Sequence, residues 1–153
     1  MHETEALHIR RLTAEDLGPL YRLLSDPAVM RYLEPPFTRA QTEAFLQKAG
    51  MGREPLIRAV EDGRGFAGYV IYHPYDETSM ELGWVLASDR WGRGYALALT
   101  RQMICRARES GRDAVIECHP QQAATRHIAE KLGFRPCGMD GGCCVYRLAG
   151  KNE

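Results

Sequence analysis

The sequence lacks an excess of charge of either sign and a long apolar run. Its 153 residues carry 20 Lys and Arg against 20 Asp and Glu, so the formal net charge is zero. Composition therefore provides no long-range attraction to nucleic acid or to an anionic membrane, and we expect neither as a partner. No apolar run reaches the roughly 18 residues that suggest a membrane span, and the opening residues MHETE do not resemble a signal peptide. We expect a cytoplasmic protein.

Paired cysteine motifs are also missing. The five cysteines are odd in number and include no Cys-x-x-Cys pair, which argues against a disulfide framework and a structural zinc site. Cys105 and Cys118 lie within apolar patterns, and we expect both as reduced thiols in the core. No metal is expected as a cofactor.

A glycine turn between an apolar strand end and a long helix is the most informative stretch, within residues 84–109. Gly92 and Gly94 allow positive φ and a close approach of ligand to backbone. The helix that follows points unpaired amide N–H groups and its positive dipole end toward one spot. That spot suits a phosphate, and Arg90 and Arg93 would add charge-assisted hydrogen bonds.

Other interpretations of this turn are open. No Gly-Lys-Ser/Thr follows it, as a P-loop requires, and Leu97 occupies the third glycine position of the dinucleotide-binding fingerprint. An ordinary strand-to-helix turn would also need glycines for its backbone geometry alone.

A second stretch, HPQQAATRHIAEKLGF over residues 119–134, favours a specific family. It resembles the signature NPxNxxSxxxxxKLGF of the GNAT (Gcn5-related) N-acetyltransferases, particularly the branch with the ribosomal-protein N-terminal acetyltransferases. The EKLGF ending matches closely. His119 and Gln122 replace the asparagines of the signature, and Thr125 replaces its serine.

The glycine turn is similar to the phosphate-loop signature of the same family, Gln/Arg-x-x-Gly-x-Gly/Ala. Gly94 and Ala96 are the matching small residues, whereas Trp91 replaces Gln/Arg. The resemblance covers about residues 7–148, and we expect one domain over residues 1–153.

This resemblance implies an α/β (α+β) fold with a mixed, mostly antiparallel central sheet and helices on both faces. The order of apolar patterns agrees with a mixed sheet. The expected strands are residues 7–12, 55–61, 66–72, 78–86, 113–118, 134–137 and 143–148, with turns at 62–65, 73–76 and 139–142 and helices at 17–24, 27–33, 38–49, 96–109 and 120–132.

The resemblance also implies acetyl-CoA as acyl donor. Backbone groups of a splayed strand would bind its pantetheine arm, the glycine turn would bind its pyrophosphate, and the second signature would add contacts. The pantetheine arm would be bound by Val85, Leu86 and Ala87. The pyrophosphate would be bound by Trp91, Gly92, Arg93, Gly94, Tyr95, Ala96 and Leu97. The contacts from the second signature would come from His119, Gln122 and Thr125.

For catalysis, the resemblance points to Glu81 as the base, because some relatives use a carboxylate on this strand. An apolar neighbourhood would raise its pKa toward the working range. Many relatives carry a tyrosine in the helix of the second signature, where it serves as the general acid. This chain has Ala129 at that position. Tyr146 is the candidate acid, with His119 and His127 as alternatives by proximity.

The sequence therefore predicts an N-acetyltransferase that transfers acetyl from acetyl-CoA to a primary amine by direct attack. The acceptor is open between a small-molecule amine and a protein N-terminus, and a homodimer is open as well. Alternatives are a non-catalytic acyl-CoA-binding module and a nucleotide-binding or purely structural α/β domain. The resemblance implies that the N-terminal helical region lines the acceptor groove, and packing between the two helices is the alternative for each residue there. The candidate acceptor contacts are Met30, Arg31, Tyr32, Leu33 and Phe37.

Overall fold

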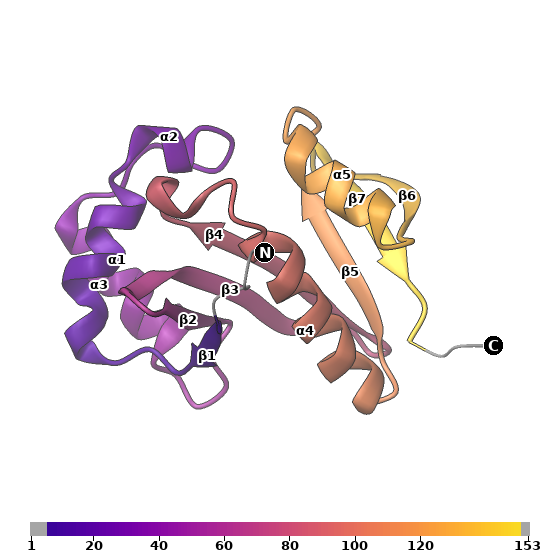
Figure 1. Ribbon diagram of the computed structural model, residues 1–153, viewed down its shortest axis with the longest axis horizontal. Coiled ribbons are helices and arrows are strands. Elements are labelled where there is room, and N and C mark those ends of the chain that lie inside the picture. The colour runs from indigo at the N-terminus through magenta and orange to yellow at the C-terminus, as the bar shows by residue number, and fades with distance from the viewer. Residues whose placement is uncertain (1–5, 151–153) are drawn as a thin grey trace. The chain divides into compact units, whose positions relative to one another are not determined.

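The computed structural model describes residues 6–150, whose strands form a seven-stranded sheet in the order β1-β2-β3-β4-β5-β7-β6 (Figure 1). The pairs β1 with β2, β2 with β3, β5 with β7 and β6 with β7 are antiparallel, whereas β4 and β5 are parallel. The strands are β1 (His8–Arg10), β2 (Ile57–Asp62), β3 (Gly65–Asp76), β4 (Ser79–Leu86), β5 (Asp113–Cys118), β6 (Arg135–Asp140) and β7 (Cys143–Leu148). The predicted mixed, mostly antiparallel α/β fold is confirmed.

The α-helices are α1 (Leu17–Leu24), α2 (Pro27–Met30), α3 (Arg39–Phe45), α4 (Tyr95–Glu109) and α5 (Ala123–Lys131). Short 3-10 turns cover Ala14–Asp16 and Ser88–Arg90, and a π-helical turn, Leu46–Gly50, extends α3. By its contacts the chain divides into two compact units. The first unit contains residues up to 71 and residues 84–95; the second contains residues 72–83 and those from 96 onward.

The first unit has a core of aliphatic side chains from the N-terminal helices and strands β2 to β4. Leu20, Leu24, Leu46, Ile57 and Val85 are all buried in this cluster. Burial of each such side chain contributes about 1.5–3 kcal/mol.

Local hydrogen bonds explain where the N-terminal helices begin. Thr38 Oγ1 accepts from the Gln41 N–H at 3.1 Å, and Gln41 Oε1 accepts from the Thr38 N–H at 2.8 Å. This reciprocal capping box satisfies two amide groups at the start of α3. Asp26 caps α2 through the Ala28 N–H at 2.9 Å, but α2 ends at Met30 and not at residue 33.

In the second unit, α4 buries Leu99, Met103, Ile104 and Ala107 along one side of the helix. Cys118 is buried as predicted, but Cys105 is exposed, so its assignment to the core is wrong. On a helix it follows Ile104 by one residue, and the step of about 100° turns it away from the buried stripe.

The predicted turn at residues 73–76 is wrong, because β3 continues to Asp76. Strand β2 pairs with β3 only as far as Ile71, so the missing N–H of Pro74 interrupts no hydrogen bond to β2. Asp76 then forms the turn one step later, accepting from the Thr78 N–H at 2.9 Å and the Ser79 hydroxyl at 2.7 Å.

Two further boundaries differ from the sequence expectation. Helix α5 begins at Ala123 and not at residue 120, because residues 119–122 form a turn closed by the Gln122 N–H and the His119 carbonyl. Strand β6 reaches Asp140, so the final hairpin turns at residues 141–142.

Candidate active site

The glycine turn has the backbone geometry that the sequence predicts. Gly92 and Gly94 have φ values of 75° and 80°. A Cβ built at either position meets no described atom within 4 Å, so glycine is needed there for its backbone angle and not for space. Residues 91–94 are exposed, and α4 begins directly after them.

Asp62 binds the residues on both sides of this loop. Arg90 donates to Asp62 through Nε at 2.8 Å and Nη2 at 3.1 Å, and the Tyr95 hydroxyl donates to Asp62 Oδ2 at 2.8 Å. The Asp62 side chain is fully buried and that of Arg90 is 8% exposed. Hydrogen bonding from Arg90, with smaller contributions from the Arg64 amide and Tyr95, holds the pKa of Asp62 far below its usual range.

The expectation that Arg90 binds phosphate is therefore wrong, because its guanidinium is buried against Asp62 and Asp89. Arg93 is exposed beside the glycines. Asp62 was expected only as a turn residue. The sequence contains no signal for its ion pair, which joins residues 28 positions apart.

The backbone groups predicted for the pantetheine arm already make internal hydrogen bonds. The exposed Trp91 indole donates to the Leu86 carbonyl at 3.0 Å, and the Ala87 N–H donates to the Ala67 carbonyl at 2.9 Å. A ligand that uses these groups would share or displace those bonds. Val85 is buried next to them, and its carbonyl lies against Gly68, where there is no room for a Cβ.

In the second unit, Glu81 lies on β4 beside His73 of β3. The distance from His73 Nε2 to Glu81 Oε1 is 3.8 Å, and both side chains are about one-quarter exposed. Burial is the main cause that raises the pKa of Glu81; His73 lowers it and Glu117 raises it further. The environment agrees with the raised pKa expected from the sequence.

The sheet register places Glu117 on the same face as Glu81. Glu81 is opposite Val115 in the parallel pair of β4 and β5, and Glu117 follows two residues later. Glu117 accepts a hydrogen bond from Tyr75, which is the main cause that raises the pKa of Tyr75 to about 12.

The sequence interpretation missed His73, Tyr75 and Glu117 as neighbours of the candidate base. The first two were assigned to a turn, and an alternating pattern extended past Ile71 would have placed both on one face of β3.

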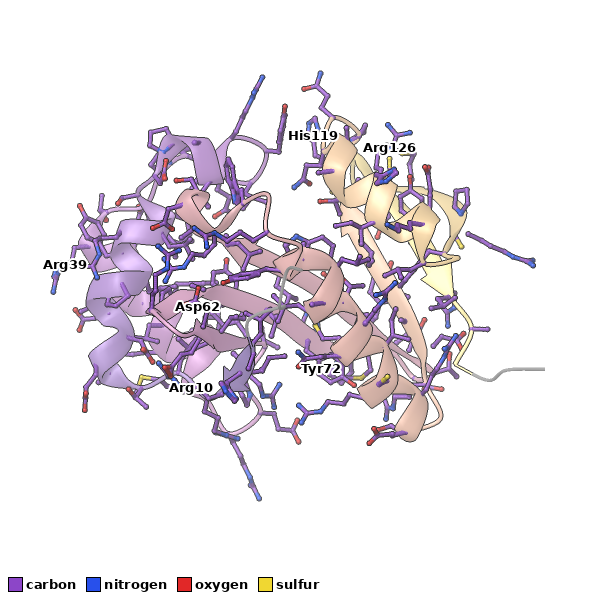
Figure 2. The ribbon with its side chains drawn as sticks, in the orientation of Figure 1. Arg10, Arg39, Asp62, Tyr72, His119 and Arg126 are labelled. Carbon is purple, nitrogen blue, oxygen red and sulfur yellow. The ribbon has the colours of Figure 1, made fainter. Side chains whose placement is uncertain are left out.

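Tyr146 lies on the other face of the sheet. It is opposite Ile116 in the β5–β7 pair, whereas Val115, on the Glu81 face, is opposite Arg147. Arg126 of α5 donates from Nε to the Tyr146 hydroxyl at 3.2 Å, and Figure 2 shows Arg126 on that helix. The structure thus separates Tyr146 from Glu81 by the thickness of the sheet, and its acid role stays a prediction.

The second signature, residues 119–134, contains the turn before α5 and the whole of that helix. The His119 N–H donates to Gln122 Oε1 at 2.8 Å, and the Gln121 N–H donates to His119 Nδ1 at 3.0 Å. Thr125 lies half-buried in the first turn of α5. His119 and Gln122 are therefore neighbours, while His127 is exposed on the helix.

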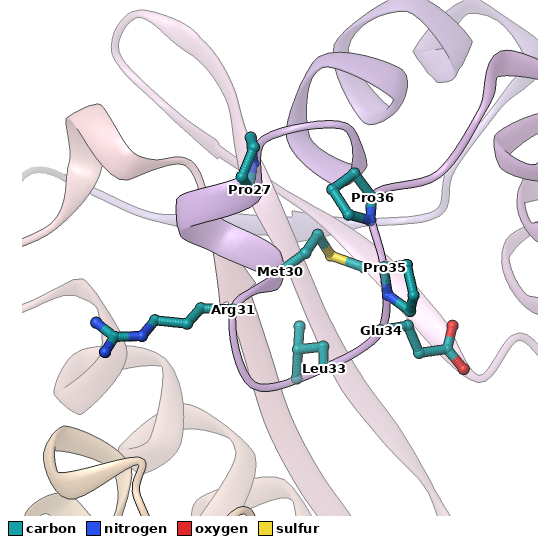
Figure 3. A pocket seen from close by; sticks show the side chains of 7 residues that line it. All are labelled: Pro27, Met30, Arg31, Leu33, Glu34, Pro35 and Pro36. Carbon is teal, nitrogen blue, oxygen red and sulfur yellow. The ribbon is translucent and has the colours of Figure 1, made fainter.

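A pocket of about 320 Å³ lies beside α2 in the first unit (Figure 3). Three of the predicted acceptor contacts line it, namely Met30, Arg31 and Leu33. In Figure 3 Arg31 and Glu34 point outward on opposite sides. Phe37 instead packs edge-on against Phe45, with ring centroids 5.8 Å apart. The remaining lining residues are Pro27, Pro35 and Pro36.

The model of the acetyltransferase (GNAT) domain family matches residues 6–135, and the chain belongs to this family. Family membership makes the chain an acyltransferase enzyme and supports acetyl transfer from acetyl-CoA to an amine. The resemblance seen in the sequence is confirmed at the level of the superfamily, whereas the ribosomal-protein branch stays a prediction.

One curated relative is the uncharacterized N-acetyltransferase YnaD of Bacillus subtilis (strain 168), 27% identical over 145 residues, which cover 92% of this chain and 85% of YnaD. A GNAT-family acetyltransferase from Bacillus anthracis has a TM-score of 0.80 at 24% identity, with 97% of each chain covered. Spermidine N-acetyltransferase from Vibrio cholerae, in complex with CoA and spermine, has a TM-score of 0.74 at 21% identity, with 93% of each chain covered. These structures show a shared fold.

No helix within residues 6–150 combines the length and the apolar character that a bilayer crossing requires.

Proposed function

We propose that the chain transfers the acetyl group of acetyl-CoA to a primary amine by direct attack in a ternary complex. The observation that carries this proposal is the exposed loop of residues 91–94. Two glycines with positive φ precede the 15-residue helix α4, and both flanking residues are bound to one buried carboxylate. Amide N–H groups at a helix start bind phosphate well.

Glu81 is the proposed base. The amine substrate is protonated near neutral pH and must lose a proton before it can attack. A carboxylate with a raised pKa is a stronger base than an ordinary carboxylate and accepts this proton more readily. The amine nitrogen then bonds to the thioester carbonyl carbon and the carbon–sulfur bond breaks. Sulfur leaves as thiolate and takes up the second proton, which the nitrogen loses as it becomes an amide. Burial raises the pKa of Glu81, His73 lowers it, and Glu117 raises it further. Holding the two reactants side by side lowers the activation barrier by roughly several kcal/mol more.

The proposed acceptors are small-molecule amines, with a protein N-terminus as the second class. The V. cholerae relative is a spermidine N-acetyltransferase whose structure contains spermine, which makes polyamines the first amines to test. Glu81 and Glu117 share one face of the second unit, which suits a cationic substrate. The pocket at Met30 and Leu33 offers an apolar surface of a size typical of small-ligand sites.

The test is a calorimetric titration with acetyl-CoA, CoA and ATP, followed by thiol release with spermidine, other amines and peptides with free N-termini. We expect both CoA forms to bind more tightly than ATP and thiol release to depend on the amine. Binding without release across the panel would favour the acyl-CoA-binding module. Tighter binding of ATP, or no binding of CoA, would contradict the proposal.

A further inference from the structure

We infer that Asp62 is a positioning residue for the cofactor loop, which acts by holding Arg90 and Tyr95 on either side of residues 91–94. The inference rests on the proposed function, because it assumes that this loop receives the pyrophosphate of acetyl-CoA.

The geometry ties the two ends of the loop to one point. Arg90 ends the 3-10 turn before the loop, Tyr95 begins α4 after it, and both side chains donate to the Asp62 carboxylate at 2.8–3.1 Å. A further hydrogen bond from the Arg64 N–H at 2.8 Å fixes Asp62 itself at the end of β2. The carboxylate thus accepts four hydrogen bonds and is fully buried.

The loop needs such an external anchor. Its four residues are exposed, and two of them are glycines, which lose more conformational freedom on ordering than any other residue. A loop that is disordered before binding must be ordered by the ligand, and this cost lowers affinity. Because Asp62 fixes both ends before any ligand arrives, less of that cost falls on binding.

Stability alone is a poor reason for this arrangement. A buried ion pair contributes little to stability relative to well-packed apolar residues, because desolvation offsets most of the charge attraction. A fixed geometry is the property that an apolar replacement would not supply, since only directed hydrogen bonds hold two donors at set angles.

The chain contains a matched control. Asp16 is also buried and binds Arg10 through two hydrogen bonds, at 2.8 and 2.9 Å, and it also accepts from a backbone amide, that of Thr13. This pair lies at the start of α1 and touches neither end of the loop. Loss of either carboxylate should lower stability, but only loss of Asp62 should alter the loop.

The experiment compares Asp62→Asn, Tyr95→Phe and Asp16→Asn with the wild type, below the unfolding temperature of each protein. Each is assayed with acetyl-CoA and with S-acetylpantetheine, a donor without the pyrophosphate, and its affinity for CoA is measured by calorimetry. For Asp62→Asn we expect the KM for acetyl-CoA and the Kd of CoA to rise about tenfold, which equals about 1.4 kcal/mol, while kcat changes little. Tyr95→Phe, which removes a single hydroxyl and keeps the ring, should show a smaller rise in the same direction.

With S-acetylpantetheine, Asp62→Asn should have the kcat/KM of the wild type, and Asp16→Asn should lower Tm without changing either KM. An equal loss with both donors, or CoA affinity unchanged in both Asp62→Asn and Tyr95→Phe, would overturn the positioning role while leaving the proposed function intact. Failure of the wild type to bind CoA would instead overturn the proposed function and this inference with it.

Discussion

Glu81 is surrounded by groups that shift its pKa in opposite directions. Burial and Glu117 raise this pKa, and His73 lowers it. As a base Glu81 must be ionised, so activity should rise with pH through a range above that of an ordinary carboxyl group. In Glu81→Gln this rise of activity with pH, the acid limb of the pH profile, should disappear. The kcat should fall by about 100-fold, at the lower end of the range for general base catalysis, and the affinity for CoA should stay unchanged.

Glu117→Gln is the control for that profile. Removing the neighbouring negative charge should lower the pKa of Glu81 and shift the limb to lower pH, with the plateau rate kept. Glutamine retains an acceptor for the Tyr75 hydroxyl, so the local hydrogen bond survives. A profile identical in wild type and Glu81→Gln would exclude Glu81 as the base.

The same residue predicts an effect on stability. The pKa of Glu81 is raised in the folded state, so the folded protein keeps the proton to a higher pH than the unfolded chain does. Stability should therefore fall as pH rises from the ordinary carboxyl pKa to the raised one. Glu81→Gln removes this loss, so its Tm should match the wild type at low pH and exceed it above the raised pKa. Thermal unfolding across pH checks the sign, and a gap that closes with rising pH would contradict it.

At the scale of one element, the glycine turn gives a direct test of the phosphate site. Gly94→Glu forces a residue with a Cβ into φ near 80° and adds negative charge where phosphate is expected. We expect CoA affinity to fall at least about tenfold. Gly63→Glu in the β2–β3 turn is the control, because a Cβ there meets no described atom within 4 Å and the position has no positive φ. Calorimetry should show wild-type affinity for the control; equal affinity in both variants would count against the site.

Elements with strong local signals were predictable from the sequence. The Thr38 capping box and the positive φ of Gly94 follow from chemistry within a few residues. The end of β3 differs from the expected turn at residues 73–76, because whether Pro74 can remain in a strand depends on which strand lies beside it. Cys105 was misplaced because an apolar stretch does not by itself tell which side of a helix is buried.

For the molecule as a whole, the sequence predicts one domain over residues 1–153, although its contacts fall into two compact units. If the prediction holds, calorimetric unfolding should show one cooperative transition. A ligand that binds only the folded state should raise the temperature of this single transition. At a ligand concentration of 100 times Kd, the added stability is about 2.7 kcal/mol. Two separable transitions, of which acetyl-CoA shifts only one, would contradict a single domain.

The overall fold and the family could be predicted because two signature stretches and the order of elements suffice for them. The partners of the site side chains could not. Asp62 and Arg90 are 28 residues apart and Tyr146 and Arg126 are 20 apart, and each pair meets only because the tertiary fold brings them together. Sequence patterns report burial and local geometry, and they carry no information about which distant charge a side chain faces.

The two hydrogen bonds from the loop ends to Asp62 also fix how long the loop is. Arg90 and Tyr95 reach the same carboxylate only with four residues between them in this conformation. One inserted residue would rotate or displace the start of α4, and one deletion would pull Arg90 out of its buried site. The loop is therefore more sensitive to insertions and deletions than to a substitution of the exposed Arg93 side chain, and engineered variants should preserve its length and both glycines before the rest of its composition.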